Sequence, residues 1–175
     1  MKKLLYNPSQ VVTVNTNGKN FKRGKELSEM ECLTENSIIL EDDLIKDIIP
    51  TASVSRNNFE EIIDLTGKVI LPGLIECHTH TAFTGSRANE FRQKLAGVDY
   101  EEIAAAGGGI ASTVKSVRSA SFEELVKTVS PRIEYFIQQG ITTIEIKSGY
   151  GLNFENEVKL LQVIKYLNEI FSIDI

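Results

Sequence analysis

Residues 71–80 read Leu-Pro-Gly-Leu-Ile-Glu-Cys-His-Thr-His, an apolar run that ends in the chain's only two histidines. Because alternate side chains of an extended strand lie on one face, we expect His78 and His80 to project together from the end of a strand. Two neutral imidazoles side by side form part of a typical transition-metal site, although a catalytic zinc takes about three protein ligands. The stretch predicts a buried strand that carries half of a metal site, and a surface turn is the alternative.

The same alternation places Glu76 on the face of the two histidines and Cys77 on the opposite face. We expect the Glu76 carboxylate either to accept a hydrogen bond from an imidazole, which would fix the tautomer of a metal ligand, or to pair with Lys147. Cys77 is expected to be a buried, small apolar side chain and not a ligand.

The composition excludes several classes of protein. Of the 175 residues, 42% are hydrophobic and 25% are charged, as in a globular domain. The net charge of -5 and the absence of a block of lysine and arginine argue against nucleic acid or an acidic membrane as partner. No apolar run approaches the ~18 residues that cross a bilayer, and the N-terminal one is too short for a signal peptide. Two isolated cysteines favour a reducing compartment, so we expect a cytoplasmic chain.

Residues 1–70 form the first predicted domain, and their pattern is one of short strands separated by turns. Strands are expected at residues 11–14, 37–40, 44–49, 61–65 and 68–71. Asn17-Gly18 and Thr66-Gly67 are turn signals, and Pro50 is expected to end the third strand. This pattern predicts a small sheet or half of a sandwich, and none of its residues suggests catalysis.

Residues 71–175 form the second predicted domain, in which strands and helices alternate. Strands are expected at residues 74–80, 141–147 and 173–175, and helices at 100–106, 112–118, 122–139 and 154–170. Residues 83–97 are expected to be a long connection. The alternation predicts an α/β fold with a parallel sheet, either doubly wound or a barrel.

Local signals set the ends and faces of the two longest helices. Ser121 and Glu124 have the spacing of a capping box, and Asn153 is the expected cap of the last helix. Pro131 should kink the first of the two helices, or break it with Ser130 as a second cap. The buried face of the last helix is expected to carry Val158, Leu161, Ile164 and Leu167. In the strand at 141–147, Thr143, Glu145 and Lys147 should share a polar face opposite Ile144 and Ile146.

Four stretches of the chain resemble a known family. Residues 72–80 are similar to the first-strand metal motif of the amidohydrolase superfamily. Within it, residues 83–87 (FTGSR), residues 104–114 (AAAGGGIASTV) and residues 145–152 (EIKSGYGL) are similar to the imidazolonepropionase family. The resemblance is strong over residues 70–168 and weak over the first 65 residues.

The resemblance implies a fold, a reaction and four site residues. The family's fold is a (β/α)8 barrel with a small β-sandwich, so this chain would be a partial TIM barrel with an N-terminal sandwich portion. The implied reaction is hydrolysis of the small molecule 4-imidazolone-5-propanoate to N-formimidoyl-L-glutamate, with one divalent or trivalent metal ion, zinc or iron. His78 and His80 match metal ligands, and Arg87 and Tyr150 match positions that hold the substrate. Glu76 departs from the family's more frequent aspartate.

The chemistry of Arg87 and Tyr150 agrees with these implied roles. A propanoate carboxylate suits the planar, permanently charged fork of an arginine. Tyr150 lies between Gly149 and Gly151, whose freedom lets the backbone approach a ligand, and its ring could stack on a planar imidazolone. The alternatives are a solvated loop arginine and a tyrosine that packs a turn.

The resemblance also implies what residues 1–175 do not contain. The family's further histidine and aspartate ligands, and its catalytic glutamate and histidine, come from later strands. We therefore expect no catalytic residue within the chain, a proton carrier beyond Ile175, and an N-terminal fragment that is inactive alone. A homodimer is left open for the full-length protein. The alternatives are another amidohydrolase, such as a cyclic amidase or a deaminase, and a non-catalytic truncated domain.

Overall fold

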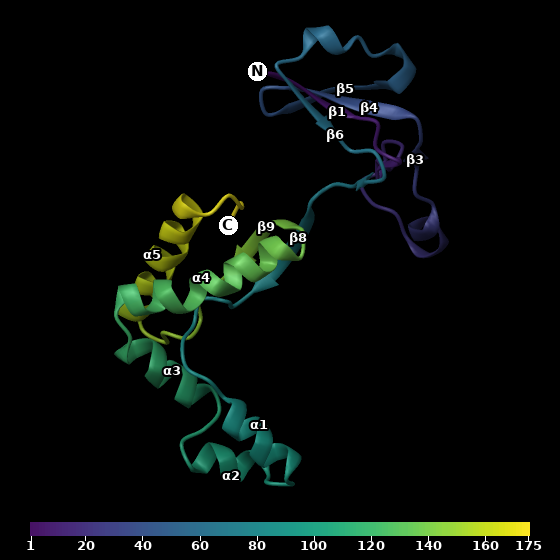
Figure 1. Cartoon of the computed structure of the whole chain (residues 1–175). Helices are drawn as coiled ribbons and strands as arrows, with labels where there is room; N and C mark the ends of the chain where they lie inside the picture. Colours follow the sequence, from purple (N-terminus) through teal and green to yellow (C-terminus); the bar gives the residue numbers. More distant parts are fainter. The chain divides into compact units, whose positions relative to one another are not determined.

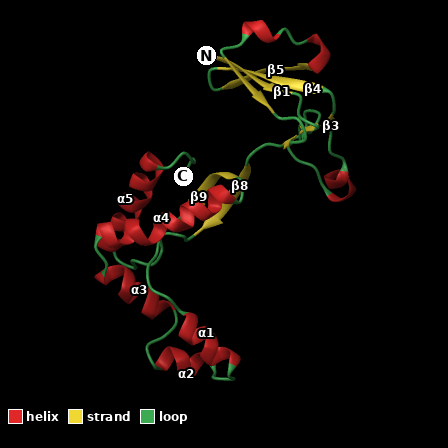
Figure 2. Ribbon diagram, viewed as in Figure 1, coloured by secondary structure: helices red, strands yellow, loops and turns green.

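The computed structural model describes residues 1–175 and divides into two compact units, Met1–Pro72 and Gly73–Ile175. The first unit is built of strands and short 3-10 helices, and the second of helices and a small two-stranded sheet (Figures 1 and 2). No helix in either unit combines the length and the apolar character that crossing a membrane requires.

The first unit contains two small sheets. A four-stranded sheet has the order β5-β4-β1-β6, and a three-stranded sheet has the order β3-β2-β7. The strands are β1 (Lys2–Tyr6), β2 (Gln10–Val12), β3 (Cys32–Leu33), β4 (Asn36–Glu41), β5 (Leu44–Pro50), β6 (Glu61–Asp64) and β7 (Val69–Ile70). Three 3-10 helices lie at Gly24–Ser28, Thr51–Ser53 and Arg56–Asn58.

The predicted strands of this unit are confirmed, and β1 and β3 are additions to them. β1 pairs antiparallel with β4 and parallel with β6, so it lies in the interior of its sheet. Its central residue Leu4 is fully buried. Ile38 of β4 and Val11 of β2 are also buried, with only a few per cent of their surface exposed. The turn at Thr66-Gly67 does not make a hairpin, because β6 and β7 belong to different sheets. Pro50 is the last residue of β5, as expected.

The second unit begins with β8 (Leu74–Thr79), which pairs in parallel with β9 (Ile141–Ile146). Between them lie α1 (Ala88–Leu95), α2 (Tyr100–Ala105), α3 (Ile110–Ser119) and α4 (Phe122–Gln138), and α5 (Phe154–Ile170) follows β9. A parallel bridge joins Thr143 of β9 to Asp174. The segment after α5 thus begins a further parallel strand beside β9, as the sequence predicted.

The core of this unit lies between β9 and the helices α4 and α5 (Figure 1). Ile144 and Ile146 of β9 are buried, whereas Glu145 and Lys147 are exposed, so the predicted division of this strand into two faces is confirmed. The helices contribute a set of buried apolar side chains: Leu125, Val129 and Ile133 from α4, and Leu160, Val163, Ile164 and Leu167 from α5.

Both predicted helix caps are present. The Ser121 side chain accepts a hydrogen bond from the Glu124 amide, and the Glu124 side chain accepts one from the Ser121 amide. The Asn153 side chain accepts one from the Asn156 amide. Of the two alternatives for Pro131, the break is wrong: α4 is continuous, and the Ser130 hydroxyl donates back to the Val126 carbonyl instead of capping a new helix. The other alternative, a kink at Pro131, stays a prediction.

Three further expectations are wrong. Residues 83–97 are not a plain connection, because they contain α1. The expected face of α5 is wrong in part: Ile164 and Leu167 are buried as predicted, but Leu161 is 51% exposed, and Leu160 and Val163 are buried instead. Cys77 is exposed and not buried, since α4 and α5 pack on β9 and leave this side of β8 uncovered, where Ile75 is 70% exposed.

Candidate metal centre and substrate site

His78 and His80 lie at the carboxyl end of β8, the first just inside the strand and the second just after it. Their ring centroids are 5.4 Å apart and their planes meet at 78°, so the two imidazoles lie edge to face. Both side chains are exposed. The structure therefore brings the two predicted metal ligands together, although no group of three or more His, Cys, Asp or Glu side chains gathers around them or elsewhere.

A carboxylate from the neighbouring strand approaches the histidine pair. Oε1 of Glu145 in β9 lies 3.4 Å from Nδ1 of His78 and 3.5 Å from Nζ of Lys147. The Thr79 hydroxyl also donates to the Glu145 carbonyl, at 2.9 Å, which ties the two strand ends together. Glu145 is thus the acidic neighbour of His78, a residue that sequence reasoning placed only on a polar face.

Glu76 makes neither of the two contacts considered for it. Its Oε1 lies 3.4 Å from the backbone nitrogen of His78, and Lys147 pairs with Glu145 instead. A hydrogen bond from a histidine imidazole to the Glu76 carboxylate stays a prediction.

Gly149 lies directly beside the ring of His80. A Cβ atom at this position would lie 2.9 Å from Nδ1 and 3.0 Å from Cε1 of His80, and its φ of +146° is one that residues with side chains rarely adopt. The absence of a side chain at Gly149 therefore lets its backbone pack against this imidazole. Two exposed imidazoles with a nearby carboxylate are donors that zinc and iron accept, so these residues fit a transition metal.

The ring of Tyr150 lies beside that of His80. Its ring centroid lies 5.9 Å from that of His80 at an interplanar angle of 68°, and 5.6 Å from that of Phe83. Tyr150 is half-buried and packs against the core of the unit. A candidate substrate-binding side chain therefore stands directly beside a candidate metal ligand.

The segment after His80 is fixed by Arg132 of α4. Its Nη1 donates to the Thr81 carbonyl at 2.8 Å and to the Phe83 carbonyl at 2.6 Å, and its guanidinium lies 3.9 Å from the Phe83 ring centroid. Burial lowers the pKa of Arg132. Two charge-assisted hydrogen bonds from one rigid fork hold the backbone that leads away from the histidines. Sequence periodicity gave no sign of this contact.

Arg87 precedes α1 and is held by Glu90, one turn later. Nε of Arg87 donates to Oε2 of Glu90 at 2.7 Å, and the Gly109 amide donates to the same oxygen at 3.0 Å. The hydrogen bond with Glu90 raises the pKa of Arg87, and the one with Arg87 lowers the pKa of Glu90. Sequence reasoning missed Glu90, although its i, i+3 spacing from Arg87 is that of a helical ion pair.

The ion pair of Arg87 and Glu90 forms part of the wall of a cleft of about 290 Å³. The cleft is lined by Arg87, Glu90, Phe91, Lys94, Tyr100 and Ile103. Only Nε of Arg87 is engaged in a hydrogen bond, so the two terminal nitrogens remain available to a ligand. No hydrogen bond or ring contact joins Arg87 to the histidines, and Tyr150 adds only a minor electrostatic contribution to its raised pKa. The four site residues thus form one cluster of His78, His80 and Tyr150, with Arg87 in a cleft of its own.

No family model matches the chain. It is 47% identical over 143 residues to an imidazolonepropionase of Photorhabdus laumondii, an alignment that covers 82% of this chain and 34% of the relative. It is 56% identical over 115 residues to an imidazolonepropionase of Hyphomonas neptunium, covering 66% of this chain and 28% of the relative. The chain spans about a third of the length of the curated relatives that it matches.

Solved structures share the fold at low sequence identity. A Xaa-Pro dipeptidase with bound methionine aligns with a TM-score of 0.57 and 17% identity, over 99% of this chain and 32% of its own. A mutant atrazine chlorohydrolase of Arthrobacter aurescens, complexed with zinc and atraton, aligns with a TM-score of 0.56 and 16% identity, over 98% of this chain and 34% of its own. The fold of this chain is therefore the one found in part of each of these two solved structures.

Proposed function

Because the chain is a homologue of the imidazolonepropionases over about a third of their length, we propose that its protein hydrolyses 4-imidazolone-5-propanoate to N-formimidoyl-L-glutamate. The bond that breaks joins a ring nitrogen to the ring carbonyl of a cyclic amide, in the degradation of histidine. Identities of 47% and 56% to imidazolonepropionases do not favour a different amidohydrolase.

We propose that Gly73–Ile175 forms the first βα units of a (β/α)8 barrel. The parallel pairing of β8 with β9 and the parallel bridge from β9 to Asp174 support this, because strands of such a barrel are all parallel and follow one another around it. The histidines lie at the carboxyl end of β8, which is the end of the barrel that carries catalytic residues. The strands of Met1–Pro72 would form part of a small sandwich domain.

His78 and His80 would hold one metal ion, zinc or iron. Their edge-to-face arrangement 5.4 Å apart and the exposure of both side chains support this role. A bound metal of this kind polarises a carbonyl and lowers the pKa of a water ligand to about 7. Glu145, 3.4 Å from Nδ1 of His78, would orient that ring through a hydrogen bond to the nitrogen that does not face the metal. We assign no residue of this chain the role of proton carrier.

Arg87 would bind the propanoate carboxylate of the substrate. Its free terminal nitrogens match the two oxygens of a carboxylate, and the bond from Nε to Glu90 fixes the plane of the guanidinium. Glu90 has only 16% of its side chain exposed, so this anchor is partly shielded from solvent. Lys94, which lines the same cleft, adds positive charge near the carboxylate.

Tyr150 would pack against the planar ring of the substrate. The observation that carries the proposal is the contact of Tyr150 with His80, at 5.9 Å between ring centroids. It places an aromatic surface that suits a flat heterocycle directly beside a candidate metal ligand. A neutral amide ring held there would meet the metal with its carbonyl while its propanoate extends away.

We also propose that the protein works in the cytoplasm on this small molecule. The two free, exposed cysteines fit a reducing compartment. Neither a nucleic acid nor a membrane has a part in the proposed function.

The test is hydrolysis by the protein expressed from the complete reading frame that contains residues 1–175. Loss of 4-imidazolone-5-propanoate and formation of N-formimidoyl-L-glutamate should be followed by mass spectrometry, before and after removal of metal with a chelator. We expect turnover that disappears with the metal and returns when zinc or iron is added. A metal-loaded protein that hydrolyses uncharged cyclic amides but not this substrate would contradict the proposal.

A further inference from the structure

The turn at residues 149–152, which carries Tyr150, has a backbone conformation that neighbouring residues must stabilise. Gly149 has a φ of +146°, and Leu152, which has a side chain, has a φ of +50°. Side chains disfavour such positive φ values, so the surrounding structure must hold them. Two charged side chains from different helices contact this turn. Glu157 of α5 binds its backbone amides, and Arg118 of α3 binds its backbone carbonyls.

Glu157 holds the amide side of the turn. Its Oε1 accepts hydrogen bonds from the Gly151 amide at 2.8 Å and from the Leu152 amide at 2.7 Å. Burial would raise the pKa of Glu157, but hydrogen bonds from Ser148 and from the amides of Leu152 and Gly151 outweigh it and lower the pKa. The carboxylate therefore stays ionised at neutral pH, as a strong acceptor for the turn.

Gly151 lets the turn lie directly on the start of α5. A Cβ at this position would lie 2.6 Å from the backbone nitrogen of Glu157 and 2.7 Å from the carbonyl carbon of Asn156. The turn and the first turn of the helix are thus in backbone contact, which fixes the position of the Glu157 carboxylate relative to the amides that it accepts.

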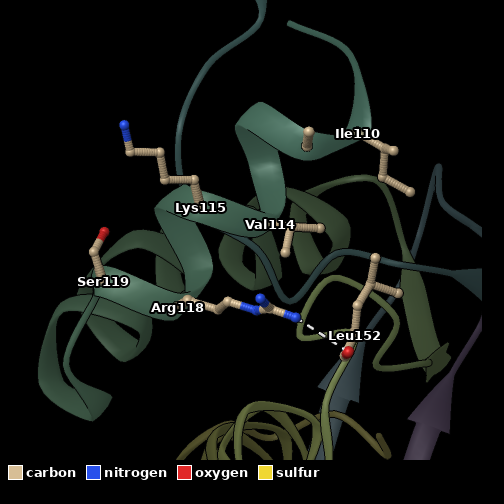
Figure 3. A pocket seen from close by; sticks show the side chains of 7 residues that line it. Ile110, Val114, Lys115, Arg118, Ser119 and Leu152 are labelled. Carbon is tan, nitrogen blue, oxygen red and sulfur yellow. Dashed lines mark hydrogen bonds between the residues drawn. The ribbon is translucent and has the colours of Figure 1, made fainter. Parts of the chain in front are cut away.

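Arg118 holds the carbonyl side of the turn. Its Nε donates to the Gly151 carbonyl at 2.7 Å. Its Nη2 donates to the Leu152 carbonyl at 3.1 Å, as Figure 3 shows. The end of α3 is itself tied to α5, because Nζ of Lys159 donates to the Val117 carbonyl at 3.0 Å and to the Ala120 carbonyl at 2.8 Å. The helices that carry Arg118 and Glu157 are therefore linked to each other by hydrogen bonds.

We propose that Arg118 and Glu157 are positioning residues that clamp the turn at residues 149–152 and so hold Tyr150 against His80. Neither side chain needs to touch the substrate, since each acts through the backbone on either side of Tyr150. The inference rests on the proposed function only in assigning Tyr150 to substrate binding. The clamp itself is a property of the turn and can be measured without a substrate.

The first experiment measures hydrogen exchange of the amides of residues 150–152 in the protein from the complete reading frame. We compare the wild type with Glu157→Ala, Glu157→Gln and Arg118→Ala, and with Glu155→Ala and Lys115→Ala as controls on the same two helices. Loss of a hydrogen bond to a charged group should speed exchange by about tenfold to a hundredfold. Glu157→Gln keeps an oxygen acceptor and should fall between wild type and Glu157→Ala. Unchanged exchange in Glu157→Gln, Glu157→Ala and Arg118→Ala would overturn the clamp.

The second experiment measures kcat, KM and metal content of the same variants with 4-imidazolone-5-propanoate. A loosened Tyr150 should raise KM by about tenfold while metal content stays that of the wild type, and Arg118→Lys should recover part of the loss. Faster exchange with an unchanged KM would overturn the positioning role. A wild type without turnover would instead contradict the proposed function, and the exchange rates would still decide whether the clamp exists.

Discussion

A Cβ atom on Gly149 would lie 2.9 Å from Nδ1 of His80, so the turn after β9 and the histidine after β8 are in direct contact. Real Cβ atoms do not approach other heavy atoms this closely, and any side chain at Gly149 would have to displace the imidazole. The orientation of a candidate metal ligand therefore depends on a residue that carries no functional group.

Gly149→Ala should displace His80 and weaken metal binding by about tenfold, a loss of the size seen when groups that orient metal ligands are removed. The measurement is metal affinity by competition with a chelator. Gly97→Ala is the matched control, because Gly97 also has a positive φ, +90°, but has no atom within 4 Å of the added Cβ. Equal affinities of the two variants would show that backbone strain, and not contact with His80, determines the effect.

Arg87→Lys should raise KM for 4-imidazolone-5-propanoate by about tenfold to a hundredfold, since hydrogen bonds to charged groups contribute roughly 1.5–3 kcal/mol. A lysine ammonium cannot reproduce the two parallel hydrogen bonds of a guanidinium on a carboxylate. Steady-state kinetics test this, with Arg92→Lys as a control on the same helix. An unchanged KM would show that Arg87 does not bind the substrate.

Glu90→Gln should raise KM several-fold, less than Arg87→Lys, and leave kcat unchanged. The amide oxygen can still accept from Arg87 and from the Gly109 amide, but the ionic part of the contact is lost. Glu102→Gln, on the exposed side of α2, is the control. If the kinetics of Glu90→Gln and Glu102→Gln were the same, Glu90 would have no part in orienting Arg87.

The carboxylate of Glu157 should make stability depend on pH. Its pKa is lower in the folded chain than its ordinary value of about 4.3. A group with a lowered folded pKa contributes stability that is fully present above the unfolded pKa and is lost as pH falls through the folded pKa. The difference in Tm between the wild type and Glu157→Gln should therefore be largest near neutral pH and shrink below about pH 4. A difference that stays constant from pH 7 to pH 3 would contradict the lowered pKa.

Much of the secondary structure could be predicted because its signals are local. Short apolar runs bounded by turn residues identified β4 and β5, the alternation of strands and helices identified β9, and the caps at Ser121 and Asn153 identified the starts of α4 and α5. α1 was missed because its apolar residues, Phe91 and Leu95, are both exposed and give no buried stripe. β1 was missed because only its Leu4 is buried and its first two residues are lysines, so it lacks the apolar run of the other strands.

The candidate site could be predicted only in part, because local signals reveal only the contacts within one segment. His78 and His80 share one strand, so their spacing alone brings them together. The neighbours Glu145, Arg132 and Glu157 come from other elements, and their contacts depend on how β9, α4 and α5 pack. No pattern within one segment encodes such packing, and the burial expected for Cys77 failed because it too depended on which strand the helices cover.

The metal content of the purified protein from the complete reading frame tests the central claim most directly. Elemental analysis should find one zinc or iron per chain in the wild type. His78→Ala and His80→Ala should each lose most of it, because no other side chain of β8 can supply the missing imidazole. Cys77→Ala, which changes the residue next to His78 in β8, should keep the metal. Full metal content in both histidine variants would contradict the assignment of His78 and His80 as the metal pair.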